Sequence, residues 1–281
     1  MDDHVHPTLQ GQDLIARSIA GRLTTVDGPM HVDAARFAAL PDWQTYARRL
    51  GDTEYDHYAV AHTIRVLNNI PFFKETNPEA LARYNKIVSD LEAGFPPEIL
   101  ETCRNWQKPE THIGGQRPIS GMVGRVMIKR GRFAEAEKLC AAAIRHVAPY
   151  TSWNLEFTYF MLVSRERVHG KLSDADRRIA LDAIERGKFL LSHGTVTTGL
   201  TERFMGRLHQ LRGEWAEAIP FLVHARQKLA GNDLVAADQA LIESYVRTGD
   251  RTSATKIIEQ GEAQPAFADQ YRRMRQAFLK Q

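Results

Sequence analysis

The chain has 281 residues, a formal net charge of +3 and a 43% share of hydrophobic residues. This length allows one or two domains with a sizeable core, and so small a net charge does not by itself indicate a nucleic-acid-binding protein. No apolar run approaches the length of a membrane span, and no apolar segment of signal-peptide length follows the acidic start at Asp2 and Asp3. The composition therefore predicts a cytoplasmic protein that does not enter a membrane.

Two cysteines, Cys103 and Cys140, stand far apart in segments that are expected to be apolar faces of helices. Cysteine in such a position behaves as a small hydrophobic residue, and disulfides are rare in reducing compartments. Both are therefore predicted to be free thiols in the core.

The first 110 residues are predicted to form an irregular helical region. Four aliphatic residues near its start share a helical stripe: Leu14, Ile15, Ile19 and Leu23. The sequence Asp27-Gly28-Pro29 then indicates a turn. In the helical stretch that follows, the expected core contacts are Trp43, Tyr46 and Leu50.

Three further helices are predicted before residue 110. The first runs from Thr53 to Asn69. The second begins at Asn77-Pro78-Glu79, where an N-cap, a proline in the first turn and a carboxylate near the positive helix end coincide. The third opens at Pro96-Pro97 and continues through Trp106. No segment shows the strict alternation of a half-buried strand, so the fold is predicted to be all α.

The second half of the chain contains an internal repeat. Residues 124–136 and 206–218 align without a gap: each begins Gly-Arg, has a glycine at a turn, an aromatic residue two positions later, and ends Ala-Glu-Ala. Because glycine adopts the left-handed conformation that closes a helix, each copy is expected to be a helix, a turn and a second helix. Weaker copies surround Gly170 and Gly249.

These segments resemble tetratricopeptide repeats. The residues that carry the resemblance are Gly124, Gly131, Phe133 and Ala136 in one copy and Gly206, Gly213, Trp215 and Ala218 in the other. The family repeats every 34 residues, whereas the spacing here is irregular. The resemblance covers about residues 118–261 and implies helix hairpins stacked into a right-handed superhelix, whose concave face binds peptides or proteins. Residues 118–281 are therefore expected to be TPR-like repeats closed by a capping helix.

Basic residues gather on the expected first helices of these repeats: Arg125, Lys129, Arg167, Arg203, Arg207 and Arg247. If those helices line the concave face, as the resemblance implies, the groove is basic and suits an acidic peptide, a C-terminal carboxylate or a phosphorylated segment. The alternative is a charged face balanced by glutamates on neighbouring helices. The sequence thus predicts a non-catalytic adaptor for an acidic protein partner, without a cofactor.

Two other functions stay open. An enzyme would need a pocket between the N-terminal helices and the repeats, with these candidate residues: Asp56, His57, His62, His112 and Arg117. His57 and His62 are five residues apart and do not share a helix face as a zinc-binding pair would, so no metal site is expected. An RNA-binding repeat would use the basic face and the basic final helix near Arg272, but it needs exposed aromatic residues for stacking.

Overall fold

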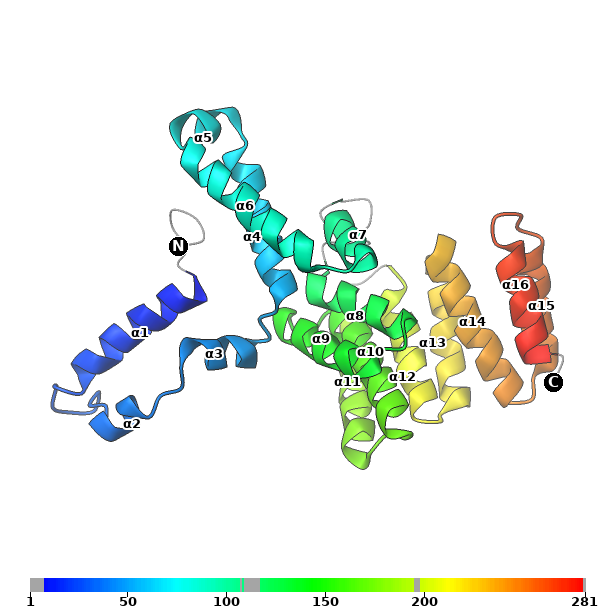
Figure 1. The fold of residues 1–281 in the computed structure, drawn as a ribbon. Coiled ribbons are helices and arrows are strands. Elements are labelled where there is room, and N and C mark those ends of the chain that lie inside the picture. The colour runs from blue at the N-terminus through cyan, green and yellow to red at the C-terminus, as the bar shows by residue number, and fades with distance from the viewer. Residues whose placement is uncertain (1–7, 107, 109–116, 195–197, 280–281) are drawn as a thin grey trace. The chain divides into compact units, whose positions relative to one another are not determined.

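The computed structural model describes residues 8–106, 108, 117–194 and 198–279. In these residues the regular structure consists of sixteen helices without a strand (Figure 1). The prediction of an all-α protein is therefore confirmed. None of the helices in the described ranges combines the length and the apolar character needed to cross a bilayer.

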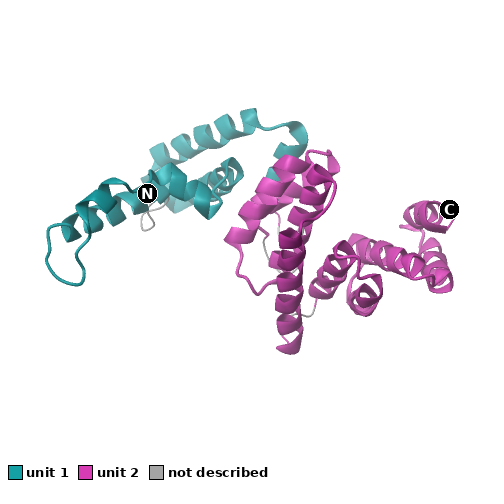
Figure 2. Cartoon of the chain, turned by 90° about the horizontal axis from the view of Figure 1, so that it is seen from below, with its two compact units in different colours: residues 1–107 teal, residues 108–281 magenta. Residues whose placement is uncertain are grey.

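The chain divides into two compact units, unit 1 with residues 1–107 and unit 2 with residues 108–281 (Figure 2). The helices of unit 1 are α1 (Leu9–Leu23), α2 (Ala34–Ala38), α3 (Trp43–Leu50), α4 (Glu54–Asn68), α5 (Pro71–Thr76), α6 (Pro78–Gly94) and α7 (Pro97–Trp106). Those of unit 2 are α8 (Ile119–Lys129), α9 (Phe133–His146), α10 (Ser152–His169), α11 (Asp174–Ser192), α12 (Leu200–Leu211), α13 (Trp215–Lys228), α14 (Gly231–Arg247), α15 (Arg251–Glu262) and α16 (Ala268–Leu279).

Local chemistry explains where the helices of unit 1 begin. Thr53 caps α4 in a capping box with Asp56, and the Asn77 side chain accepts a hydrogen bond from the backbone of Ala80 at the start of α6. Each cap satisfies a backbone N–H that has no partner within the helix. The predicted starts of α4, α6 and α7 are confirmed.

The packing of unit 1 is uneven. Helices α4, α6 and α7 share a buried core that includes Tyr58, Val88 and Ile99. Three residues of the aliphatic stripe of α1, Leu14, Ile15 and Ile19, are exposed, whereas Leu23 is partly buried. Helix α1 packs mainly on the short helices α2 and α3. Leu50 is 56% exposed, so its expected role as a core contact is wrong: it lies in the last turn of α3, beside an open cavity between α1 and α3.

In unit 2, consecutive helices pack as antiparallel neighbours and alternate helices also touch. Helix α8 contacts α10, α10 contacts α12, α12 contacts α14 and α14 contacts α16, so these five helices form one layer (Figure 1). The turn glycines predicted from the repeat, Gly131, Gly170, Gly213 and Gly249, have φ values of +72°, +77°, +81° and +86°. Their left-handed conformation is confirmed.

The two gapless copies make the same close contact. A Cβ added to Gly124 would lie 2.9 Å from Cys140 Sγ, and one added to Gly206 would lie 2.5 Å from Leu222 Cγ. Cys140 and Leu222 occupy matching positions on the second helices, and both are fully buried. The absence of a side chain at each glycine therefore lets α8 approach α9 and α12 approach α13.

Both cysteines are buried free thiols, as predicted. Burial raises the pKa of Cys103 and of Cys140 to about 12, because a thiolate is poorly solvated there. Neither thiol is a reactive nucleophile in this fold.

Helix α16 packs on α14 and α15 through its apolar side, with Tyr271 fully buried. The Tyr271 hydroxyl donates a hydrogen bond of 2.7 Å to Asp238 Oδ2 on α14. Two basic residues of α16 form ion pairs with nearby acids: Arg272 pairs with Asp269, and Arg275 pairs with Glu262. Apolar burial and local ion pairs together hold this helix against the end of unit 2.

Candidate functional site

Four arginines of unit 2 form ion pairs with three carboxylates from alternate helices. We call these seven residues the arginine cluster: Arg117, Arg125, Arg203, Arg207, Glu156, Asp233 and Glu243. Arg117 precedes α8, and the other six residues lie on α8, α10, α12 and α14. The cluster thus follows the layer of alternate helices described above.

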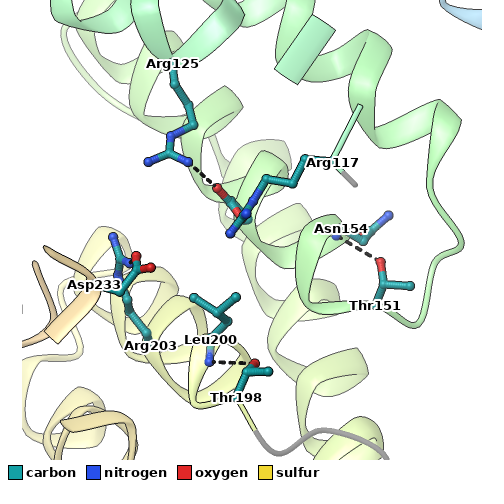
Figure 3. A network of polar contacts seen from close by, with 9 residues as sticks. Arg117, Arg125, Thr151, Asn154, Thr198, Leu200, Arg203 and Asp233 are labelled. Atoms are coloured by element: carbon teal, nitrogen blue, oxygen red, sulfur yellow. Dashed lines mark hydrogen bonds and ion pairs between the residues drawn. The ribbon is translucent and has the colours of Figure 1, made fainter. Parts of the chain in front are cut away.

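Glu156, on α10, is shared by two arginines (Figure 3). Its Oε2 accepts a hydrogen bond of 2.8 Å from Arg117 Nε, and its Oε1 accepts one of 3.1 Å from Arg125 Nη1. The side chains of Glu156 and Arg117 are 1% and 5% exposed, whereas that of Arg125 is 33% exposed. Two guanidinium groups therefore meet one buried carboxylate, and Arg125 is the member that solvent reaches.

Arg203 on α12 is held by Asp233 on α14, and its side chain is only 11% exposed. The guanidinium also lies 5.0 Å from the centre of the Phe204 ring. Burial lowers the pKa of Arg203; Asp233 and Glu156 oppose that shift, and the like charge of Arg125 adds to it. Arg203 is thus a largely buried cation that is paired with Asp233 and lies within the field of a second arginine.

Arg207, one turn further along α12, joins three helices. Its Nε donates a hydrogen bond of 2.8 Å to the hydroxyl of Tyr159 on α10, and its Nη1 lies 3.4 Å from Glu243 Oε2 on α14. The guanidinium also stacks over the Tyr159 ring, at 5.0 Å from its centre, as that of Arg125 does over Phe160 at 5.4 Å. The two copies of the repeat therefore place an arginine against an aromatic ring of α10.

The cluster carries four guanidinium groups and three carboxylates. The Asn154 side chain, drawn in Figure 3, is buried, and among the described residues its Oδ1 has no hydrogen-bond partner. Buried polar atoms are rarely left unsatisfied. An anion with a hydrogen-bond donor would match both features.

The six predicted groove residues do not all belong to the cluster. Arg125, Arg203 and Arg207 belong to it, whereas Lys129, Arg167 and Arg247 are exposed in the last turns of α8, α10 and α14. Arg247 there lies over the Trp215 ring, 5.3 Å from its centre. The balancing acids that the sequence left as an alternative are present on neighbouring helices, as Glu156, Asp233 and Glu243 show.

The residues of the alternative enzyme pocket have separate roles. Asp56 completes the cap of α4, the His57 Nε2 atom lies 2.7 Å from Asp52 Oδ2, and His62 packs beside the Tyr58 ring. Arg117 belongs to unit 2 and pairs with Glu156. His112 lies outside the described residues. In unit 1, Asp56, His57 and His62 therefore act as local structural contacts.

His62 should make the stability of unit 1 depend on pH. Burial, followed by repulsion from Arg65, lowers its pKa below the usual 6.5, and Glu92 only partly opposes this. The unfolded chain therefore binds this proton more readily than the folded chain, so stability is complete above about pH 6.5 and falls as the pH drops below it. We expect urea unfolding of His62→Gln to lose this dependence, whereas His224→Gln, at an exposed site in unit 2, should retain it. Identical pH profiles for His62→Gln and the wild type would contradict the prediction.

No protein-family model matches this chain, and neither a curated protein nor a solved structure matches it.

Proposed function

We propose that residues 118–261 are TPR-like repeats and that the protein is a cytoplasmic, non-catalytic adaptor. Its arginine cluster would bind an acidic or carboxylate-bearing segment of a partner protein. The repeat assignment is supported by the matched contacts of Gly124 and Gly206 and by the left-handed glycines at successive turns. It is also supported by the layer of alternate helices, which is the layer that carries the arginines.

The observation that carries the binding proposal is the proximity of two like charges, because partly exposed Arg125 lies within the electrostatic field of Arg203. A buried cation is costly unless a partner of opposite charge accompanies it, and here the two guanidinium groups repel each other while Glu156 is already shared with Arg117. A carboxylate bound beside Arg125 would weaken the repulsion between the two guanidinium groups. Guanidinium groups suit this role because their planar fork matches a carboxylate in two contacts.

The surroundings of the cluster favour a protein carboxylate over RNA. Stacking of nucleic-acid bases needs aromatic faces that are open to solvent. Tyr159 and Phe204 are only 6% and 2% exposed, and their rings are already covered by Arg207 and Arg203. These aromatic residues therefore support the arginines and do not offer a surface for bases.

Arg125→Gln is the sharpest test of this site. In this variant Glu156 still pairs with Arg117, so the fold should persist. The positive charge that solvent reaches, that of Arg125, is lost. We expect affinity for an acidic peptide with a free C-terminal carboxylate to fall by roughly tenfold, the effect of one charge-assisted hydrogen bond. Fluorescence polarisation with a labelled acidic peptide library, each peptide both free and amidated at its C-terminus, would measure this.

The matched control is Arg167→Gln, which removes an exposed arginine outside the cluster and should leave affinity unchanged. Glutamate is a poor replacement at Arg125 or Arg207, because a new carboxylate beside Glu156 or Glu243 would perturb folding as well as binding. Equal peptide affinity for the wild type and for Arg125→Gln, or equal loss in both arginine variants, would count against the proposed function.

A further inference from the structure

Helices α1 and α3 border an apolar cavity within unit 1. Its volume is about 370 Å³; α1 contributes Leu9, Ala16 and Ala20 to its lining, and α3 contributes Trp43, Tyr46 and Leu50. Small-molecule sites are apolar clefts of about 300 to 1,000 Å³ with a few polar groups. The cavity therefore has the size of a small binding site.

The packing of α1 is incomplete in the absence of an occupant. This 15-residue helix has no buried side chain, although its N-terminus is well capped by Thr8. A helix of this length is only marginally stable on its own and depends on the packing of its apolar side. Ala16 and Ala20 line the cavity and are not packed against another helix there. A ligand in the cavity would therefore add apolar contacts to α1.

The lining also indicates what that material is. The two charged lining residues neutralise each other, since Arg17 Nε donates to Asp13 Oδ2 at 2.6 Å, and Arg17 donates a further hydrogen bond to the carbonyl of Pro41. The cavity thus presents no net charge to an anion or a cation. Most of its remaining surface comes from aliphatic and aromatic side chains, which favour an apolar occupant.

We propose that α1 and α3 form a binding site for an uncharged, mainly apolar small molecule. The flat rings of Trp43 and Tyr46 would contact it, and the small side chains of Ala16 and Ala20 leave the room for it. By proportion to a 150 Å³ cavity that binds benzene, 370 Å³ accommodates roughly 15 non-hydrogen atoms. This site is separate from the arginine cluster of unit 2 and has the opposite ligand preference.

The test uses the full chain and N-phenyl-1-naphthylamine, an uncharged dye that fluoresces in apolar surroundings. We expect saturable binding of one dye per chain, with energy transfer from tryptophan. Trp43→Phe should bind the dye but lose most of that transfer, which places the dye in the cavity. The double variant Ala16→Leu/Ala20→Leu should fill the cavity. It should therefore no longer bind the dye, and the midpoint of its thermal unfolding should rise. Ser18→Leu, which adds similar apolar surface to α1 outside the lining, should bind as the wild type does.

Three results would overturn the proposal. Equal dye binding by the filled variant and the wild type would mean that the dye adheres to other exposed apolar side chains. Unchanged energy transfer in Trp43→Phe would place the dye elsewhere. A wild type that sediments as a dimer without binding dye, and that the paired leucine substitutions convert to a monomer, would show that a second copy occupies the cavity.

Discussion

Replacement of Glu156 by alanine is expected to destabilise unit 2 by about 3 to 5 kcal/mol, the cost of breaking a buried ion pair from one side. The substitution removes the carboxylate that Arg117 and Arg125 share, and Arg117 is only 5% exposed. Two guanidinium groups would then remain close together, with Arg203 also in their field. Urea denaturation followed by far-UV circular dichroism would measure the change.

A matched control separates burial from simple loss of an ion pair. Glu135 in the first turn of α9 pairs with Arg132, the N-cap residue of this helix, but both side chains are 48% exposed. Since exposed pairs contribute only about 0 to 1 kcal/mol, Glu135→Ala should unfold within about 0.5 kcal/mol of the wild type. Glu156→Gln should fall between the two, because it keeps an acceptor for one arginine while losing the charge. If Glu156→Ala were as stable as Glu135→Ala, the cluster would not hold α8 and α10 together.

The features of this fold that sequence predicts well are those governed by neighbouring residues. Gly131 and Gly213 are left-handed, and Asn77 caps α6, because backbone conformation and capping depend on a few adjacent positions. Leu50 shows where this reasoning ends. Its helical spacing from Trp43 and Tyr46 fits a core position, but α3 ends at Leu50, and the described residues that line the cavity beside it all belong to residues 9–50.

The sequence predicted the arginines of the candidate site but not the carboxylates that pair with them. Arg125 and Arg207 stand out because they occupy equal positions in the two copies, but their partners lie 31 and 36 residues further along the chain. Asp233 follows Arg203 by 30 residues in the same way. A search for acidic residues about one repeat after each arginine would therefore have found Glu156, Asp233 and Glu243.

Position along a helix decides which basic residues join the cluster. Lys129 and Arg247 are the final residues of α8 and α14. Basic side chains are favoured there by the negative end of the helix dipole. That placement leaves them exposed at the helix ends, away from the carboxylates, although the sequence assigned them to the same face as Arg125.

The repeat itself is tested most directly at Gly206. A Cβ at this position would lie 2.5 Å from Leu222 Cγ and 3.2 Å from the carbonyl oxygen of Ala218. Both residues are fully buried on α13, so neither can move without disturbing the core. Overpacking of this kind costs about 1 to 3 kcal/mol. We expect Gly206→Ala to be destabilising even though alanine favours the helix by about 1 kcal/mol, as measured by urea unfolding.

The control and the partner variant make this result specific to the contact between α12 and α13. Gly94, the last residue of α6, has no atom within 4 Å of an added Cβ, so Gly94→Ala should be neutral or stabilising. Leu222→Ala alone leaves a cavity, but in the double variant the new methyl group occupies part of that space. The loss of unfolding free energy in the double variant should therefore be smaller than the sum of the losses in the two single variants. The difference, which is the coupling energy, should be about 0.5 to 3 kcal/mol. If the two losses of unfolding free energy were strictly additive, Gly206 and Leu222 would not be energetically coupled. The close contact of Gly124 with Cys140 would then no longer support a repeated packing contact.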